Sequence, residues 1–532
     1  MVPALLVIVA GANNMSRKRF GENFSFFSNT QRDLQRQFEQ TRAVERAFEI
    51  ESLMANASAS NLLGDGRLAD TSDIEDAGLL NGKGLIVGGW DGEFMTYDGD
   101  SSLIIFLRAG GGKNVNFIFP NLAFIKDRSL VVVDIKDGEN AYCSADYRRD
   151  TLGQKCVFLN PYDLLGFTNI KINPLCALLE LKHSGVAIDS EYDDIAEIII
   201  PSPLKKSSND WVMSGAQQVI AWLLNYLTVD DPENLNLGFL WRFVNSGGRE
   251  QADFFAFMKV SNDDTVAARA SMYEAMALDA PKQWLAYMSE IQKAVSVYKP
   301  DTSLEQSTRA NEFDFAALKS EPHTVYIILP SKKVESASKW LGLILNQTIE
   351  AVAAARGDVR TTFILDELPQ YYAPAILKAL RLYRARGINF WMFAQSRLSL
   401  LSRWSKDAVG ELEDQAAVTI YKNVTEPTVL KDIEYWSGNM TILNRNVGHN
   451  GGVQQSGNLG LSESKRSVLQ AEDILSLNQD QHIIRVSNMP HLIIADTVPY
   501  FAVPEWDANL NDVRVMHQGL NAPKGKNEGR DE

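Results

Sequence analysis

Cysteine is scarce in this chain of 532 residues, which contains only Cys143, Cys156 and Cys176. An odd number of cysteines without a metal-like spacing argues against a disulfide framework and favours a reducing cytosol. All three cysteines lie in or beside apolar runs. We therefore expect buried, unpaired thiols.

Basic residues are also few relative to acidic ones, 52 against 67, and the formal net charge is -15. So acidic a chain lacks the overall signature of a nucleic-acid-binding surface, and acidic charge commonly serves solubility. Nucleic acid is still not excluded, because a ring can concentrate basic groups in its lumen and leave its outer surface acidic.

Long apolar runs are missing as well. The N-terminal run 4–12, ALLVIVAGA, is shorter than the about 20 residues that span a bilayer, although Arg17, Lys18 and Arg19 follow it as cytoplasmic flanks do. Three interpretations remain open: the end of a membrane helix that starts outside this sequence, a short interfacial or partner-binding segment, or a secretory signal. The lack of a basic residue before the run disfavours the signal. No other segment of the sequence is suited to cross a membrane.

The length predicts two or three domains, and changes in composition suggest where they divide. We expect an N-terminal segment over 1–59, with a short apolar run and a polar helical linker. A helical region over 203–305 interrupts a domain formed by 60–202 and 306–510. The polar tail 511–532 is predicted to be disordered.

Short β-rich runs recur on both sides of the helical region, and several are apolar throughout, as in buried parallel strands. After 323 they alternate with helical patterns near 336–356 and 374–386, which predicts an α/β fold with a parallel sheet covered by helices on both faces. Residues 444–467, rich in Gly, Asn and Ser, predict a mobile loop, and 482–501 predict a terminal hairpin. The runs are LIVGGW, FMTYDG, SLIIF, SLVVVD, CVFL, HTVYIILP, TTFIL, INFWMFA and AAVTIYK.

The first chemical motif is LRAGGGKN, residues 107–114, between an apolar strand and a segment that can start a helix. In a P-loop, backbone N–H groups converge on phosphates and a lysine neutralises their charge. Gly110, Gly111 and Gly112 would supply the close backbone approach, and Lys113 the charge. Asn114 replaces the usual Ser or Thr, and its side-chain oxygen is a candidate magnesium ligand. A glycine-rich turn beside an unrelated lysine would give the same pattern.

Two more motifs follow apolar strands in the expected order. FILDE, residues 363–367, has the Walker B form, in which Asp366 would hold the magnesium shell and Glu367 would polarise the attacking water. FAQS, residues 393–396, places Gln395 where a polar residue senses the γ-phosphate in P-loop motor proteins. Acidic and amide residues also end strands for purely structural reasons, so the ordered combination carries the prediction.

YRARG, residues 383–387, contains two candidate arginine fingers. In a ring, an arginine from one subunit can stabilise the transition state in its neighbour. We favour Arg384 over Arg386 for this role. The alternative is a solvated helix end, where arginine suits the helix dipole.

These motifs, with about a dozen landmarks in order over roughly 60–510, resemble the conjugative coupling proteins of the TraG type, which serve type IV secretion. Further landmarks are SLVVVDIKDGENAY, FLNP, DWVMSGA, RARGINFWMFAQS and SVLQAEDILSL. The resemblance implies a RecA-like domain with an all-α insertion, ATP and Mg²⁺ as cofactors, and a homo-hexamer at the cytoplasmic face of the bacterial inner membrane. It also assigns Lys113 to the phosphates, Asp366 and Glu367 to Walker B, and Gln395 to the sensor.

The implied function is an ATPase that drives conjugative DNA, as a DNA–relaxase complex, or protein effectors into a secretion channel with other type IV components. Two alternatives stay open. A soluble translocase of the FtsK/HerA-like class would fit if the short N-terminus is complete, and a non-hydrolysing substrate receptor would fit the imperfect phosphate loop. DIKDGEN has one residue more than the DIKGE of the family, so Asp134 and Lys136 receive no role.

Overall fold

The computed structural model describes residues 62–205, 208–448 and 458–518, together with residues 36, 37, 39, 41, 42, 44 and 45. The chain divides into two compact units, the smaller of residues 1–66 and 438–468, the larger of 67–437 and 469–532. The described residues before 46 are helical, as the polar pattern predicted. The apolar run 4–12 lies outside the described residues.

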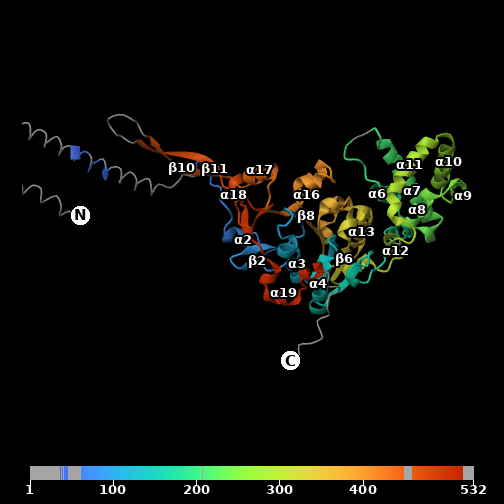
Figure 1. Cartoon of the computed structure of the whole chain (residues 1–532), viewed down its shortest axis with the longest axis horizontal. Helices are drawn as coiled ribbons and strands as arrows, with labels where there is room; N and C mark the ends of the chain where they lie inside the picture. Colours follow the sequence, from blue (N-terminus) through green and yellow to red (C-terminus); the bar gives the residue numbers. More distant parts are fainter. Residues whose placement is uncertain are drawn as a thin grey trace, which may run out of the picture. The chain divides into compact units, whose positions relative to one another are not determined.

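A sheet of 11 strands forms the frame of the larger unit (Figure 1). From β9 to the edge strand β5 all neighbours are parallel, and from β9 to the opposite edge strand β2 all are antiparallel. The antiparallel extension contains the predicted terminal hairpin, β12 with β13. The spatial order is β2 (Glu93–Tyr97), β1 (Leu85–Trp90), β13 (Ile493–Asp496), β12 (Gln481–Val486), β9 (Ala416–Lys422), β3 (Ser102–Leu107), β8 (Ile388–Ala394), β7 (Thr361–Leu365), β4 (Ser129–Asp134), β6 (His323–Ile328) and β5 (Lys155–Leu159).

The sheet is covered on both faces, because its central strands are apolar throughout. Successive residues of β3 enter different cores: Ile104 and Phe106 join one hydrophobic cluster, while Leu103 and Ile105 join the other. The predicted fold class, a parallel α/β sheet with helices on both faces, is confirmed. One face carries α3 (Phe119–Phe124), α4 (Glu139–Asp146) and α19 (Pro504–Asn509); the other carries α6 (Asp189–Ile199), α13 (Val334–Ala354), α14 (Ala375–Leu382) and α16 (Lys406–Asp414).

Between β5 and β6 the described residues form helices and turns without a strand. Trp222 centres their packing: its indole N–H donates to the Val266 carbonyl at 3.1 Å, and its ring lies against Phe243 and Tyr273. The same hydrophobic cluster continues through α6 and α13 to the sheet, so the helices share a core with it. The helices are α5 (Ala177–His183), α6, α7 (Asp210–Val229), α8 (Leu237–Asn245), α9 (Gly248–Met258), α10 (Asp264–Asp279), α11 (Pro281–Val295) and α12 (Ser303–Ser307).

The smaller unit differs from the sequence prediction. Much of the segment 444–467, predicted as a mobile loop, belongs to an antiparallel hairpin of β10 (Asn439–Gly448) and β11 (Asn458–Ser467). The ladder is continuous, with Thr441 opposite Lys465, and backbone hydrogen bonds hold it together regardless of side-chain type. Gly, Asn and Ser therefore concealed two strands from a composition-based prediction. Residues 449–457 lie outside the described residues.

The C-terminal part contains α17 (Pro427–Trp436), α18 (Ala471–Leu475), α19 and α20 (Val513–His517). Helix α20 falls within the predicted disordered tail, and that prediction is wrong for residues 511–518. Asn511 fixes this segment, because its backbone N–H donates to the Cys143 carbonyl at 3.0 Å and its side chain to the Tyr142 carbonyl at 2.9 Å. Residues 519–532 lie outside the described part.

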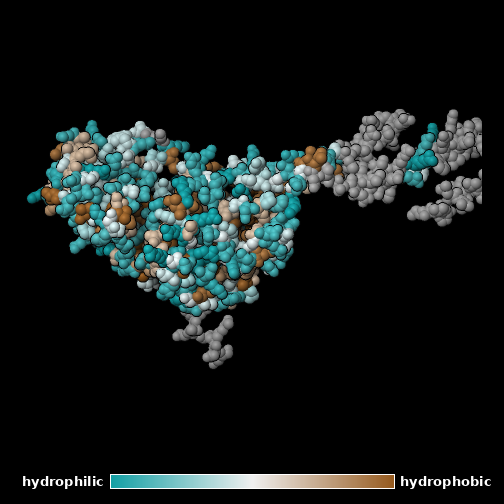
Figure 2. All heavy atoms as spheres, turned by 180° about the vertical axis from the view of Figure 1, so that it is seen from behind, coloured by the Kyte–Doolittle hydropathy of each residue, from teal (hydrophilic) through white to brown (hydrophobic). Residues whose placement is uncertain are grey.

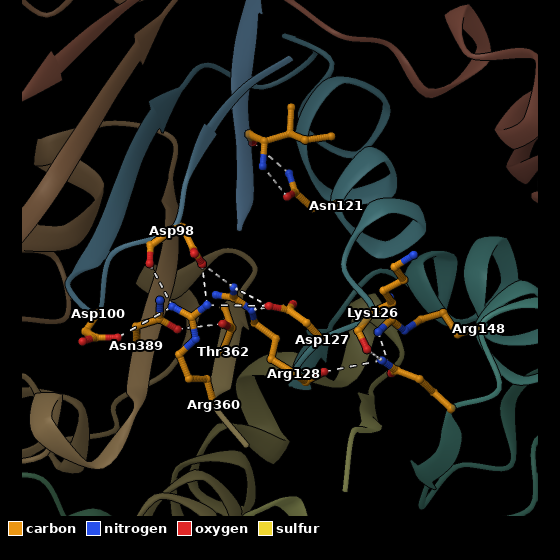
Figure 3. Close-up of polar contacts among 12 residues, drawn as sticks. Asp98, Asp100, Asn121, Lys126, Asp127, Arg128, Arg148, Arg360, Thr362 and Asn389 are labelled. Atoms are coloured by element: carbon orange, nitrogen blue, oxygen red, sulfur yellow. Dashed lines mark hydrogen bonds and ion pairs between the residues drawn. The ribbon is translucent and has the colours of Figure 1, made fainter. Parts of the chain in front are cut away.

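The amino ends of β3, β4 and β7 meet at one edge of the sheet, where charged side chains form a closed cluster (Figure 3). Asp98 accepts from Arg128 at 2.9 Å and also contacts Arg360, whose Nη1 donates to the Asp98 carbonyl at 2.8 Å. Asp127 and Asp100 complete the cluster at 3.6 and 3.7 Å from Arg360. We name Asp98, Asp100, Asp127, Arg128 and Arg360 the amino-edge cluster.

The face shown in Figure 2 is mainly hydrophilic, with apolar residues in small separate areas. Cys143, Cys156 and Cys176 are unpaired, and burial raises the pKa of each thiol, as expected for structural cysteines. Among the described residues, no helix is long and apolar enough to cross a membrane.

Candidate active site

The loop after β3 has the backbone conformation that its glycines predict. Gly110 and Gly112 have φ of 79° and 80°, which L side chains rarely adopt, and a Cβ on Gly112 would lie 2.5 Å from the Asn116 amide. The loop closes tightly: the Gly111 N–H donates to the Arg108 carbonyl at 3.0 Å. A π-helical turn, Asn114–Ile118, follows and continues into α3. The result is a glycine loop that opens a helix, as a P-loop requires.

Lys113 joins this loop to the end of β7. Its ammonium contacts Asp366 and donates to Glu367 Oε1 at 2.6 Å. Burial disfavours the charged lysine, but the two carboxylates outweigh it and raise the pKa of Lys113. Asp366 is fully buried at the end of its strand, and Glu367 follows with a left-handed φ of 50°. This turn brings both acidic side chains of FILDE to the same lysine.

Glu367 is the centre of the polar contacts. Gln395, at the end of β8, donates from Nε2 to Glu367 Oε2 at 3.1 Å, and the Lys136 ammonium lies 3.6 Å from Glu367 Oε1. Burial opposes ionisation of Glu367, but Lys113, Lys136 and Gln395 together lower its pKa. The predicted sensor and the predicted water-polarising residue are thus in contact.

Asn114 is held by a residue that the sequence did not single out. Its Nδ2 donates to Glu139 Oε2 at 2.7 Å, while its Oδ1 is buried and has no hydrogen-bond partner among the described residues. An amide oxygen without a donor fits a cation or a water in a cation shell. The predicted metal role of Asn114 is therefore chemically reasonable, with Glu139 setting the orientation of the amide.

Sequence reasoning left the end of β4 without a role, and the structure places it beside the site. Asp134 is fully buried, its Oδ2 accepts from the Ala141 N–H at 2.9 Å, and its Oδ1 has no partner in the described part. Burial, with nearby Asp366 and Glu139, raises the pKa of Asp134 to about 8. Because β4 pairs directly with β7, Asp134 and Asp366 end neighbouring strands. The sequence shows that Asp134 and Asp366 each follow an apolar strand. It could have predicted that they are neighbours only if the order of the strands in the sheet had been known.

A cavity of about 430 Å³ opens over the glycine loop, Glu367 and Gln395, while the buried Asp134 and Asp366 are not among its lining residues. It has room for several phosphate groups beside the loop. Its lining comprises residues 107–115 of the loop and helix start, together with Lys136, Glu139, Glu367, Ala394 and Gln395. Within the described residues no cluster of three or more His, Cys, Asp or Glu could hold a metal ion by itself. A magnesium ion here would depend on phosphate oxygens in addition to Asp366 and Asn114, which is its usual mode of binding.

The structure does not bring the candidate arginine fingers to this cavity. Arg384 and Arg386 are exposed and precede β8, whereas Gln395 follows it. A strand of seven residues separates the two ends by roughly 20 Å. Arg384 therefore lies at the amino edge of the sheet, away from the site of its own chain.

The sheet has a glycine loop after β3 and polar side chains at the ends of β7 and β8. This arrangement is that of a P-loop nucleotide-binding fold. The family described as "Type IV secretory system Conjugative DNA transfer" matches residues 67–522, well over half of the chain. The protein belongs to this family, which confirms the resemblance seen in the sequence. A search of curated proteins gave no significant match.

Solved structures agree with this assignment at the level of the fold. The unbound monoclinic form of the bacterial conjugative coupling protein TrwBdeltaN70 is similar with a TM-score of 0.63 and 13% identity, over 83% of this chain and 95% of that one. TrwB with the ATP analogue ADPNP gives 0.62 and 13%, over 84% and 96%, and TrwB with ADP and Mg²⁺ gives the same values. The predicted RecA-like fold is thereby confirmed.

Proposed function

We propose that this protein is a Mg²⁺-dependent ATPase that moves cargo into a type IV secretion channel. The observation that carries the proposal is the cluster of Lys113, Asp366, Glu367 and Gln395 beside the glycine loop. TrwB, whose fold it shares, was crystallised with ADPNP and with ADP and Mg²⁺. ATP and Mg²⁺ are the corresponding cofactors here.

Each residue has a role that its position supports. Lys113 exchanges its carboxylate partners for phosphate oxygens, and the loop N–H groups of Gly110–Lys113 hold the same phosphates. Bound Mg²⁺ would neutralise charge on the β- and γ-phosphates, with Asp366 and Asn114 in its shell. Glu367, released from Lys113, orients and deprotonates the attacking water. Gln395 links Glu367 to the γ-phosphate end of the cavity.

Assembly completes the site. We propose a homo-hexamer in which Arg384 of one subunit reaches the nucleotide of the next, since Arg384 is exposed and lies far from its own cavity. Among the described residues Arg384 forms no ion pair, so its guanidinium is available to a neighbour. Stabilisation of the transition state by such an arginine is typical of phosphoryl-transfer enzymes.

The cargo side of the proposal rests on the family and on the helical region 203–305. The proposed cargo is conjugative DNA with its relaxase, or protein effectors, passed on to other type IV components at the cytoplasmic face of the inner membrane. The helical region exposes large apolar side chains that a soluble domain usually buries, which supports a role in substrate engagement. They are Leu204, Trp211, Phe257, Val260, Met272, Leu278 and Leu285.

Glu367→Gln tests the proposal. The substitution is nearly isosteric, so ATP binding should persist while hydrolysis falls to background, measured as phosphate release with and without DNA. Asp137→Asn, a substitution at a half-buried side chain that accepts hydrogen bonds from Ser331, is the matched control and should hydrolyse ATP normally. Wild-type protein that binds ATP without hydrolysing it would instead identify a substrate receptor.

A further inference from the structure

A buried lysine, Lys319, belongs neither to the amino-edge cluster nor to the nucleotide cavity. It ends a 3₁₀ helix, Phe315–Lys319, on the stretch that returns from the helical region to β6, and it is only 4% exposed. Among the described residues no carboxylate forms an ion pair with its ammonium. Burial lowers the pKa of Lys319, and nearby Asp358 offsets this effect only in part. Because burial of a lysine without a counter-charge costs free energy, its one polar contact is informative.

That contact joins Lys319 to the turn that carries Arg384. The Nζ of Lys319 donates to the Arg386 carbonyl at 2.8 Å. Residues Arg384–Arg386 form a 3₁₀ turn, which Gly387 ends with a left-handed φ of 67°. The last carbonyls of a helical turn have no partner within the turn itself, so the ammonium satisfies a group that would otherwise be unpaired. Lys319 therefore holds the backbone of the turn and leaves the arginine side chains free.

Two further hydrogen bonds hold the same turn. The Thr361 N–H, at the start of β7, donates to the Gly387 carbonyl at 2.8 Å. Tyr383, which directly precedes the turn, donates its hydroxyl to Glu350 Oε2 on α13 at 2.8 Å. Together with Lys319, these contacts attach the turn to three separate parts of the chain. Its backbone is thus fixed relative to the sheet.

The side chain of Arg384 contrasts with this fixed backbone, because it is exposed and forms no ion pair in the part of the chain that the structure describes. We propose that Lys319 is a positioning residue, which fixes the turn so that Arg384 reaches the nucleotide of the neighbouring subunit. The inference rests on the proposed function, in which Arg384 acts across a subunit interface. Misplacement of a charge-stabilising group by about 1 Å can cost about a hundredfold in rate, so a lysine that never touches the nucleotide can control its hydrolysis.

Steady-state hydrolysis by the assembled protein tests this role. Lys319→Met removes the donor and should lower kcat about a hundredfold, while KM for ATP stays unchanged. Lys319→Arg keeps a charged donor and should recover much of the rate. The matched control is Lys155→Met, the same substitution at an exposed lysine of the same sheet edge, where it pairs with Glu321. Lys155→Met should hydrolyse ATP at the wild-type rate.

The Arg384→Ala background separates positioning from a purely structural role. If Lys319 acts through Arg384, adding Lys319→Met to Arg384→Ala should cause no further loss of turnover, because the group that it positions is already gone. Thermal melts verify that each variant is folded. If Lys319→Met does not fold, Lys319→Gln, which keeps a neutral donor on a shorter side chain, takes its place in the same comparison.

Three outcomes would overturn the inference. Normal turnover of Lys319→Met, with Arg384→Ala impaired, would leave the arginine in its role and remove Lys319. An equal fold-loss from Lys319→Met in the wild-type and Arg384→Ala backgrounds would reveal a general structural effect. Normal turnover of Arg384→Ala by itself would contradict the shared site of the proposed function, and the positioning role with it.

Discussion

The two edges of the large sheet hold buried charge in different ways. At the amino edge, Arg128 and Arg360 meet Asp98 and Asp127 in direct ion pairs (Figure 3), although Nη1 of Arg128 has no hydrogen-bond partner in the described part. At the carboxyl edge, Lys113 is shared by two carboxylates, and oxygens of Asn114 and Asp134 have no partner in the described part. A buried polar atom without a partner costs stability, and Asn114 differs from Arg128 in that it lines the cavity beside the glycine loop, where a ligand can complete it.

The difference separates a structural cluster from a functional one. The amino-edge cluster joins the starts of three parallel strands and brings charge of both signs together. The carboxyl edge gathers Lys113, Glu367 and Gln395 beside a cavity, where phosphates and a cation could replace the partners that these side chains have in each other. Substitutions at the two edges should therefore affect different measurements.

Lys113→Ala should have the largest effect. It removes the charge that faces the phosphates and leaves Asp366 and Glu367 without their ammonium partner, so hydrolysis should be abolished. The chain should remain folded, because Lys136 still lies near Glu367. Phosphate release measures hydrolysis, and circular dichroism shows whether the variant remains folded. Turnover at the wild-type rate would remove Lys113 from the site.

Arg384→Ala should lower hydrolysis by roughly a thousandfold in the assembled protein. In mixtures with wild type, activity per wild-type subunit should fall. A wild-type site next to a mutant subunit lacks the arginine that the neighbour would supply. Arg386→Ala is the control and should have a milder effect. Steady-state rates at increasing protein concentration complete the experiment. A rate that does not depend on concentration across the assembly range would contradict the shared site.

Arg360→Ala, in the amino-edge cluster, should affect stability and spare the chemistry. Arg360 contacts Asp98 through both its carboxylate and its carbonyl, so its loss should cost about 1–3 kcal/mol in the free energy of unfolding. ADP affinity per folded molecule should stay at the wild-type value. Urea unfolding and ADP titration measure the two quantities. Lost affinity with unchanged stability would reverse the roles assigned to the edges.

The smallest effect concerns pH and lies in the antiparallel extension. His482 is fully buried with one ring nitrogen 2.8 Å from the Val87 carbonyl, and burial lowers its pKa from 6.5 to about 4. As the pH falls, His482 is therefore protonated in the unfolded chain before it is protonated in the folded one. The contribution of neutral His482 to the free energy of unfolding is complete above pH 6.5 and is lost as the pH falls toward 4.

In His482→Gln, the melting temperature should fall less between pH 7 and pH 5 than in the wild type. The difference corresponds to at most about 2 kcal/mol, because one proton contributes about 1.4 kcal/mol per pH unit. Thermal melts at both pH values measure it, with His183→Gln, on an exposed helix end, as control. Equal pH dependence in His482→Gln and the wild type would exclude this histidine as a contributor.

Much of the fold was predictable, and the successes share one physical basis. The strand runs SLVVVD and TTFIL are apolar throughout because both faces of a parallel sheet are covered, and each ends in the residues that form the site. The hairpin β10–β11 and helix α20 were missed for the opposite reason. Their sequences are polar, and backbone pairing or a few hydrogen bonds to α4 hold them in place.

The sequence by itself determined where the glycine loop, Asp366, Glu367 and Gln395 lie, because local order along the chain places each of them at the end of an apolar strand. Only the tertiary structure decided which of these side chains meet, since strand order brings together residues that are 254 positions apart, as in the contact of Lys113 with Glu367. It also added Asp134, Lys136 and Glu139 to the site and set Arg384 at the opposite edge. Parallel strands gather their carboxyl ends at one edge, and no local pattern records which strands are neighbours.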